Sequence, residues 1–183
     1  MERPARRGLT DSDLDRLEDD GYRYELRAGL LLREPPPGFG HGRVQMRLAA
    51  ALAVFVRAQA LGEVVPDVGF VLAHDPDTVR QPDLAFVQAA RLSLLKDDTR
   101  RFPGAPDLAV EVLSPADRPG DVHAKVADFL AAGTRAVWLV DPRHRSVTCY
   151  RSLLEPRRLG EEDVLEGEDV LPGFSIALAA IFG

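Results

Sequence analysis

The segment "GAPDLAVEVLSP", residues 104–115, has the composition of a buried β-strand apart from two acids, Asp107 and Glu111. Side chains alternate across a strand. One face therefore carries Asp107, Ala109, Glu111 and Leu113, and the other carries Leu108, Val110 and Val112. An ionised carboxylate that is buried without a partner costs so much free energy that it usually becomes neutral instead. We therefore expect the acidic face to be either hydrated or paired with a positive group.

The overall composition is that of a globular protein. The chain has 183 residues, of which 45% are hydrophobic and 28% charged, so we expect a single domain over residues 1–183 with a substantial core. The single cysteine, Cys149, excludes an intramolecular disulfide and a cysteine-based zinc site, and its setting "SVTCYRS" favours an ordinary strand thiol over a nucleophile.

The chain shows no membrane or export signal. Its longest apolar run, residues 48–56, is far shorter than the roughly 20 residues that a membrane helix needs. The basic start "MERPARRG" is not followed by the apolar region of a signal peptide. We therefore expect a cytoplasmic protein with no membrane partner. The net charge of −6 argues against nonspecific coating of nucleic acid, but it is compatible with a local basic groove or a bound metal.

Helical and strand patterns alternate along the chain. Helices are predicted from Thr10, whose capping-box partner is Asp13, to Gly21; over residues 41–61 before Gly62; and over 120–132 before Gly133. Strands are predicted in a hairpin over 22–34 that turns at Ala28-Gly29, and at 63–73, 81–87, 106–113, 135–142 and 146–154. A short helix and loop are expected over 91–104, and a solvated hairpin over the acidic tail from 160. This order predicts an α/β domain with helices packed on a central sheet.

Three aspartates follow a proline near a strand. Asp83 and Asp107 stand in the same tetrapeptide, "PDLA", at 82–85 and 106–109, so they would present acids to a common region if their strands pair. Pro-Asp is also a common turn dipeptide. We interpret Asp67 and Asp107 as turn residues, whereas for Asp83 a turn and a functional role are both open.

Glu111 lies in the middle of its strand, where no turn explains it. Glutamate is depleted in strands and is almost never fully buried without a partner. Lys125 is the candidate partner, because it flanks the apolar stripe of the 120–132 helix, although a lysine that extends along the stripe towards solvent would look the same. Two carboxylates from adjacent strands and a lysine from the next helix suit a hard cation such as Mg²⁺.

Together, Asp83 in "QPDLAFV", Glu111 in "PDLAVEVLSP" and the "RAVWLVDP" segment resemble the Uma2 family of restriction-endonuclease-like proteins. The resemblance extends from "YRYELRAG" through "GDVHAKVADFLAAG" to "DVLPGF". It implies a PD-(D/E)xK nuclease fold, in which a mixed β-sheet is flanked by α-helices, and a metal-dependent endonuclease that hydrolyses DNA with Mg²⁺ or Mn²⁺. It also suggests a homodimer, because many such nucleases dimerise to cut both strands.

The resemblance also assigns roles to residues. Asp83 becomes the aspartate of the signature and Glu111, 28 positions later, becomes its second acid. Asp83, Glu111 and the backbone carbonyl of Val112 would hold the metal, and Glu25 matches an acidic residue near the first strand. Leu113 stands where the signature has lysine, so the lysine role passes to Lys125. The hairpin departs from the family pattern "IDGEL" at Ala28 and Leu30.

Other candidates and other functions stay open. His41 either faces the cleft or is an exposed turn residue, and Arg43 and Arg47, four residues apart, either contact phosphates or form a solvated helix face. The main alternative function is a catalytically inactive nuclease-fold module that binds DNA or protein. A third is hydrolysis of a smaller phosphate ester, because nothing in the sequence specifies DNA.

Overall fold

The computed structural model describes residues 8–183, and its centre is a six-stranded sheet in the order β11-β10-β9-β8-β6-β3. The strands are β3 (Gly62–Pro66), β6 (Leu84–Gln88), β8 (Leu108–Val112), β9 (Ala136–Asp141), β10 (Ser146–Tyr150) and β11 (Arg157–Leu159). β8 and β9 pair in parallel and the other neighbours pair antiparallel, so the sheet is mixed. This arrangement confirms the predicted α/β class.

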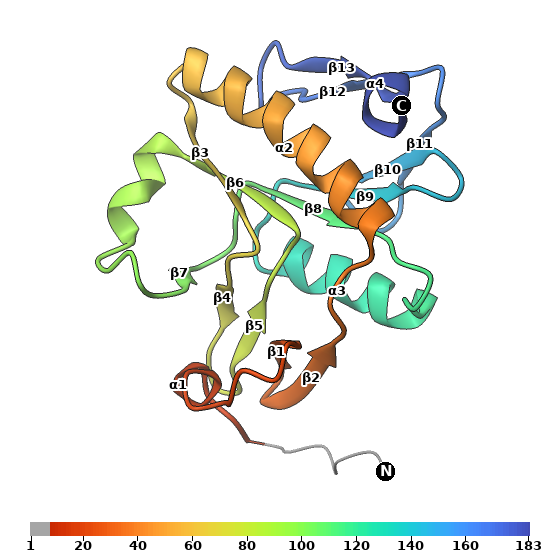
Figure 1. The fold of residues 1–183 in the computed structure, drawn as a ribbon. Coiled ribbons are helices and arrows are strands. Elements are labelled where there is room, and N and C mark those ends of the chain that lie inside the picture. The colour runs from red at the N-terminus through yellow and green to blue at the C-terminus, as the bar shows by residue number, and fades with distance from the viewer. Residues whose placement is uncertain (1–7) are drawn as a thin grey trace.

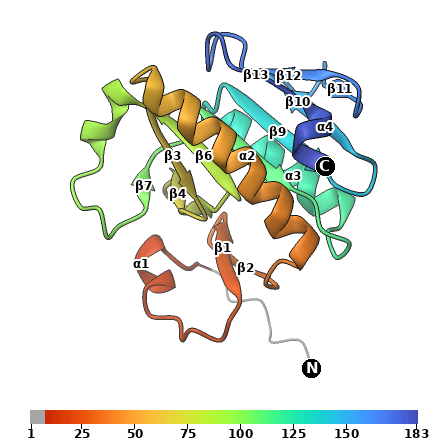
Figure 2. The ribbon, with the colours of Figure 1, turned by 45° about the horizontal axis from the view of Figure 1, so that its top comes forward.

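The two long helices lie on opposite faces of this sheet (Figures 1 and 2). α2 (Phe39–Ala58) packs against Leu108, Val110 and Val112 of β8, as the alternation of the strand predicts. α3 (Pro119–Ala131) covers the other face, where Val126 and Phe129 contact Ala109. Parallel neighbours such as β8 and β9 need a long crossover connection, which α3 provides here. No helix within residues 8–183 is long and apolar enough to cross a membrane.

A second, five-stranded sheet in the order β2-β1-β5-β4-β7 borders one end of the first (Figure 1). Its strands are β1 (Arg23–Arg27), β2 (Leu30–Glu34), β4 (Phe70–Ala73), β5 (Thr78–Arg80) and β7 (Phe102–Pro103). The β1–β2 hairpin turns at Ala28 and Gly29 as predicted, and both have positive φ, as a type I′ turn requires. The remaining elements are α1 (Asp11–Leu14), the 3₁₀ helix η1 (Ala89–Leu94), β12 (Val164–Glu166), β13 (Ser175–Ala177) and α4 (Leu178–Phe182).

Several predicted boundaries are wrong. α1 starts at the predicted Thr10–Asp13 capping box but ends at Leu14, not near Gly21. Asp19 and Asp20 accept the backbone N–H groups of Gly21 and Tyr22, and such local hydrogen bonds compete with helix formation. The predicted strand over 63–73 is split in two by a bend at Asp67, and β5 was not predicted at all.

Gly62 has a different role from the predicted helix end, since α2 already stops at Ala58. Gly62 lies in β3, and a Cβ atom there would come within 2.0 Å of the Val87 carbonyl oxygen. Glycine is therefore required by the close approach of β3 to β6. Gly133, with φ of 99°, follows α3 as predicted.

The pairing of β6 with β8 decides which acids meet. The two strands are antiparallel, with Leu84 opposite Val110 and Phe86 opposite Leu108. The same register places Asp83 across from Glu111. Asp107 lies at the other end of β8, so the expectation that Asp83 and Asp107 face a common region is wrong. Antiparallel pairing separates the two copies of "PDLA" and brings Asp83 to the Glu111 end instead.

Candidate active site

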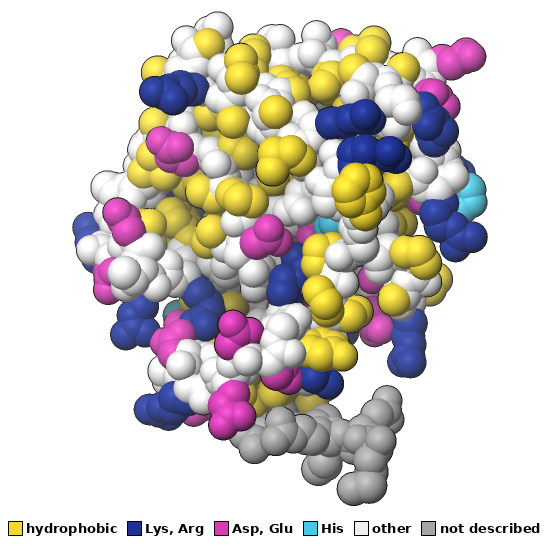
Figure 3. Space-filling view, viewed as in Figure 1, with side chains coloured by type: hydrophobic (Ala, Val, Ile, Leu, Met, Phe, Trp, Pro, Cys, Tyr) yellow, Lys and Arg dark blue, Asp and Glu magenta, His cyan; other side chains and the backbone are white. Residues whose placement is uncertain are grey.

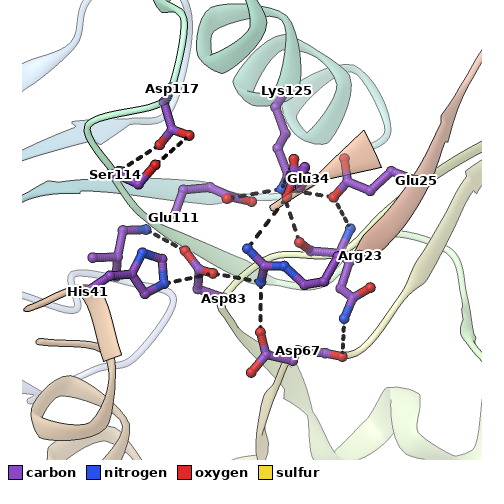
Figure 4. Close-up of polar contacts among 12 residues, drawn as sticks. Arg23, Glu25, Glu34, His41, Asp67, Asp83, Glu111, Ser114, Asp117 and Lys125 are labelled. Carbon is purple, nitrogen blue, oxygen red and sulfur yellow. Dashed lines mark hydrogen bonds and ion pairs between the residues drawn. The ribbon is translucent and has the colours of Figure 1, made fainter. Parts of the chain in front are cut away.

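Asp83 is buried, with 2% of the residue exposed, at the start of β6. Its Oδ2 accepts the backbone N–H of Val112 at 2.7 Å, which ties β6 to the end of β8. Its Oδ1 lies 2.9 Å from Nη1 of Arg23 and 3.2 Å from Nε2 of His41 (Figure 4). These donors outweigh the effect of desolvation and hold the pKa of Asp83 below its usual value. Asp83 is therefore an anion held from three sides.

Glu111 and Lys125 form the second part of the site. Nζ of Lys125, from the middle of α3, lies 3.1 Å from Oε2 of Glu111. The other carboxylate oxygen, Oε1, is buried and has no hydrogen-bond partner among the residues that the structure describes. Lys125 is itself buried, with 6% of the residue exposed, so its side chain does not extend towards solvent along the helix. The acidic face of the 104–115 segment is thus paired with a positive group, which was one of the two arrangements expected from the sequence.

Two hairpin glutamates complete the surroundings of Lys125. Its Nζ lies 2.8 Å from Oε1 of Glu25 and 3.4 Å from Oε1 of Glu34, and it donates to the Gln81 carbonyl at 3.0 Å (Figure 4). The fully buried Glu25 also accepts the N–H of Gln81 at 2.7 Å and pairs with Arg80 at 2.7 Å. Glu25 was expected from the sequence, whereas Glu34 and Arg80 were not. The hairpin therefore holds the ammonium group of Lys125 in place.

One ammonium group faces three carboxylates in this cluster. Desolvation, together with the nearby carboxylates of Asp83, Glu25 and Glu34, raises the pKa of Glu111 well above its ordinary value. Desolvation alone would lower the pKa of Lys125, but the carboxylates of Glu111, Glu25 and Glu34 outweigh it and raise that pKa. The site therefore keeps a firmly protonated lysine beside a glutamate whose charge lacks full compensation.

Arg23 is a further member of the site that sequence analysis missed. Besides Asp83, its guanidinium contacts Asp67 at 2.8 Å and Glu34 at 3.5 Å. Asp67 lies at the bend between β3 and β4, where its φ is 51°, so the turn interpretation holds. Its carboxylate also accepts a hydrogen bond from Gln45 of α2. Its position inside the "YRYELRAG" stretch was the only signal for Arg23 in the sequence.

The structure decides between the readings of His41, and it places Arg43 and Arg47. His41 is buried in the first turn of α2 and faces Asp83, so it is not an exposed turn residue. Arg47 is exposed and donates to the Ile181 carbonyl near the C-terminus. Arg43 is exposed on the outer side of α2.

Asp107 lies at a bend directly before β8, as predicted, but its carboxylate bonds to groups far from it in the sequence rather than within the turn. It is buried, and its Oδ2 accepts hydrogen bonds from the Gln88 N–H and from Arg91, each at 2.9 Å. Cys149 lies half-buried in β10, where desolvation raises the pKa of its thiol to about 12, so it is unsuited to act as a nucleophile.

The donor set at the end of β8 fits a hard divalent cation in part. The unpaired Oε1 of Glu111 supplies a buried carboxyl oxygen, the type of ligand that such cations prefer. N–H and C=O of one strand residue point to the same edge, so the Val112 carbonyl lies on the Asp83 side. Asp83 would first have to release Arg23 or His41. Among residues 8–183, no cluster of three or more His, Cys, Asp or Glu side chains is arranged to hold a metal.

Comparison with known proteins supports the fold and the family. The family model Uma2, described as "Putative restriction endonuclease", matches residues 11–179. A crystal structure of "a putative nuclease belonging to DUF820" from Anabaena variabilis ATCC 29413 is 19% identical in sequence and superposes with a TM-score of 0.81. The match covers 95% of this chain and 97% of that one, and at this identity it shows the fold. No curated protein matches the chain.

Proposed function

Because the chain belongs to the Uma2 family, we propose that it is a metal-dependent endonuclease that hydrolyses phosphodiester bonds in DNA. The observation that carries this proposal is the antiparallel register of β6 and β8, which sets Asp83 opposite Glu111, with the buried ammonium group of Lys125 3.1 Å from Glu111. Two neighbouring carboxylates can hold a divalent cation, and an adjacent ammonium group can hold a phosphate beside that cation.

The proposed cation is Mg²⁺ or Mn²⁺, held by Asp83, Glu111 and the backbone carbonyl of Val112. A divalent ion at such oxygens lowers the pKa of a bound water and neutralises charge that develops on the phosphate. The unpaired Oε1 of Glu111 supports this assignment. Arg23 and His41 compete for Asp83, so we expect them to give up part of their contact with Oδ1 when the cation binds.

The remaining side chains position the reactants. Lys125 orients the attacking water or stabilises the pentavalent phosphate, since its ammonium group is a compact point charge with three donors. Glu25 positions Lys125, because both of its oxygens are already occupied by Lys125, Arg80 and the Gln81 N–H. This arrangement favours a positioning role for Glu25 over the alternative of a second metal ligand.

The test is plasmid cleavage by the purified protein with Mg²⁺ or Mn²⁺, compared with Asp83→Asn and Asp107→Asn. Both substitutions remove one buried negative charge at a strand end, but only Asp83 belongs to the proposed site. We expect wild type and Asp107→Asn to cut and Asp83→Asn to lose at least about 10²-fold in rate, the usual effect of removing one preorganised electrostatic contact.

Other results would point elsewhere. DNA binding without cleavage by the wild type would support the inactive module instead. Cleavage of a small phosphodiester without cleavage of plasmid would support the smaller substrate. Cleavage that survives in Asp83→Asn would refute the proposed site.

A further inference from the structure

The connection between β2 and α2 runs along one edge of the proposed site. β2 ends at Glu34, which contacts Lys125, and His41 in the first turn of α2 faces Asp83. The six residues between them, "PPPGFG" at 35–40, are all exposed. This rim segment (residues 35–40) therefore joins the Lys125 side of the site to the Asp83 side.

Phe39 is the most unusual residue of the rim segment. It is the first residue of α2, two positions before His41, and 88% of it is exposed. A lone exposed apolar residue needs no explanation. Here, however, an exposed aromatic ring stands two residues before His41, which faces Asp83, and burial in the protein core does not account for it.

The glycines beside Phe39 leave the first turn of α2 open. Gly38, Gly40 and Gly42 do not have positive φ, and a Cβ atom built at any of them would meet no described atom within 4 Å. The fold therefore does not require glycine at these positions. Glycine does allow a ligand to approach the backbone closely. In the same turn, Nδ1 of the buried His41 has no hydrogen-bond partner within residues 8–183.

The charges of α2 indicate what approaches. The helix contains three arginines, Arg43, Arg47 and Arg57, and no acid, in a chain of net charge −6. Arg43 lies one turn after Phe39 on the same face. The first N–H groups of a helix lack partners inside the helix, and the N-cap Gly38 has no side chain to satisfy them. Helix N-termini of this kind favour phosphate.

We propose that the first two turns of α2 hold one nucleic-acid strand at the entrance to the site, with Phe39 stacked on an unpaired base and Arg43 at a neighbouring phosphate. The inference rests on the proposed function and narrows its substrate to single-stranded or locally unpaired nucleic acid. Aromatic side chains stack on bases of any identity, so this contact carries no sequence preference.

A second copy of the chain is the competing occupant of this face. Met46 and Val54 are also exposed on α2, by 68% and 72%, and hydrophobic side chains are spread over this side of the molecule (Figure 3). In a dimer in which α2 of one copy packs on α2 of the other, three arginines of each helix would face a helix that contains no acidic residue. Charge therefore favours a polyanion over self-association through α2.

The experiment measures binding of a fluorescent single strand and of its duplex by anisotropy. All proteins carry Asp83→Asn, so that the strand is not cut in Mg²⁺. Phe39→Ala is compared with Phe39→Trp and with Val54→Ala, because Val54 is also a largely exposed apolar residue and lies near the other end of the same helix. Arg43→Ala is compared with Arg57→Ala in the same way.

We expect Phe39→Ala to weaken single-strand binding about 5- to 150-fold, whereas Phe39→Trp and Val54→Ala leave it unchanged. The duplex should bind more weakly and depend less on Phe39. Arg43→Ala should reduce the slope of log affinity against log salt by about 0.7, and Arg57→Ala should not.

The inference is overturned if Phe39→Ala binds like Val54→Ala, or if the parent protein does not bind the single strand. It is also overturned if sedimentation shows a dimer that both Phe39→Ala and Val54→Ala dissociate, since α2 would then be an interface between copies. The proposed function fails separately, if the wild type cuts no nucleic acid while binding still depends on Phe39.

Discussion

The two ends of β8 each bury a carboxylate, but in different ways. At the start of the strand, Asp107 receives the Gln88 N–H and the Arg91 guanidinium on one oxygen, at 2.9 Å each. At the other end, Glu111 shares one ammonium group with Glu25 and Glu34, and its Oε1 has no partner among residues 8–183. Asp107 is a compensated structural ion pair. Glu111 retains a carboxyl oxygen without a partner, which leaves it available to a further ligand.

The largest expected effect comes from removing Lys125. Lys125→Met leaves Glu25, Glu34 and Glu111 without their shared cation, and breaking a buried ion pair typically costs about 3–5 kcal/mol. Urea unfolding should show this loss, and it should shrink in acid, where the carboxylates are protonated. Lys125→Arg should lose less stability because it keeps the charge.

For the fraction that folds, we expect both variants to cleave about 10²- to 10³-fold more slowly. Lys125→Met removes the charge, and the planar guanidinium of Lys125→Arg does not replace a compact ammonium group. Wild-type stability in Lys125→Met would show that the cluster does not depend on this cation.

The second prediction concerns metal binding at the Glu111 end. A ligand that binds only the folded state at 100 times its Kd stabilises that state by about 2.7 kcal/mol. Mg²⁺ should therefore raise the free energy of unfolding of the wild type and of Asp107→Asn. Thermal unfolding of Glu111→Gln should not respond. An equal response in all three proteins would place the cation elsewhere.

The third prediction concerns the compensated end. Asp107→Ala leaves the Gln88 N–H and Arg91 without an acceptor, and an unsatisfied buried polar group costs about 1–3 kcal/mol. Asp107→Asn keeps an acceptor oxygen and should lose less. Denaturant unfolding measures both losses, and plasmid cleavage at a temperature where the variants are folded should be unchanged. A loss of cleavage in folded Asp107→Asn would remove the distinction between the two ends.

The smallest expected effect on stability belongs to Glu111→Gln, and its sign is the informative part. The pKa of Glu111 is raised in the folded state, so the folded protein holds this proton more tightly than the unfolded chain does. The contribution of Glu111 to the free energy of unfolding is therefore fully present below the pKa of the unfolded chain, about 4.5. It is lost as the pH rises towards the higher pKa of the folded state.

Glu111→Gln should consequently match the wild type at pH 4 and be equally or more stable at pH 8 without metal. Thermal unfolding at the two pH values measures this difference. A variant that is clearly less stable at pH 8 would show that Glu111, like Asp107, is a structural ion-pair partner.

Much of this arrangement was predictable from local sequence. The alternation of residues 104–115 correctly assigned the two faces of β8, and the apolar stripe placed Lys125 on a helix beside that strand. Arg23 and Glu34 were not predictable in the same way. Both residues lie in the β1–β2 hairpin and reach the site only because the second sheet lies against the end of the first. Such a contact between distant segments leaves no periodic pattern in the hairpin sequence.

Asp83 and Asp107 have the same local sequence but acquire different partners in the tertiary structure. Both stand in "PDLA", and in both cases the local pattern was enough to predict an aspartate at the start of a buried strand. Only the antiparallel pairing of β6 with β8 sent Asp83 to Glu111 and Asp107 to Arg91. Strand propensity and alternation act between neighbouring residues, whereas the compensation of a buried charge depends on which groups lie within a few ångströms in space.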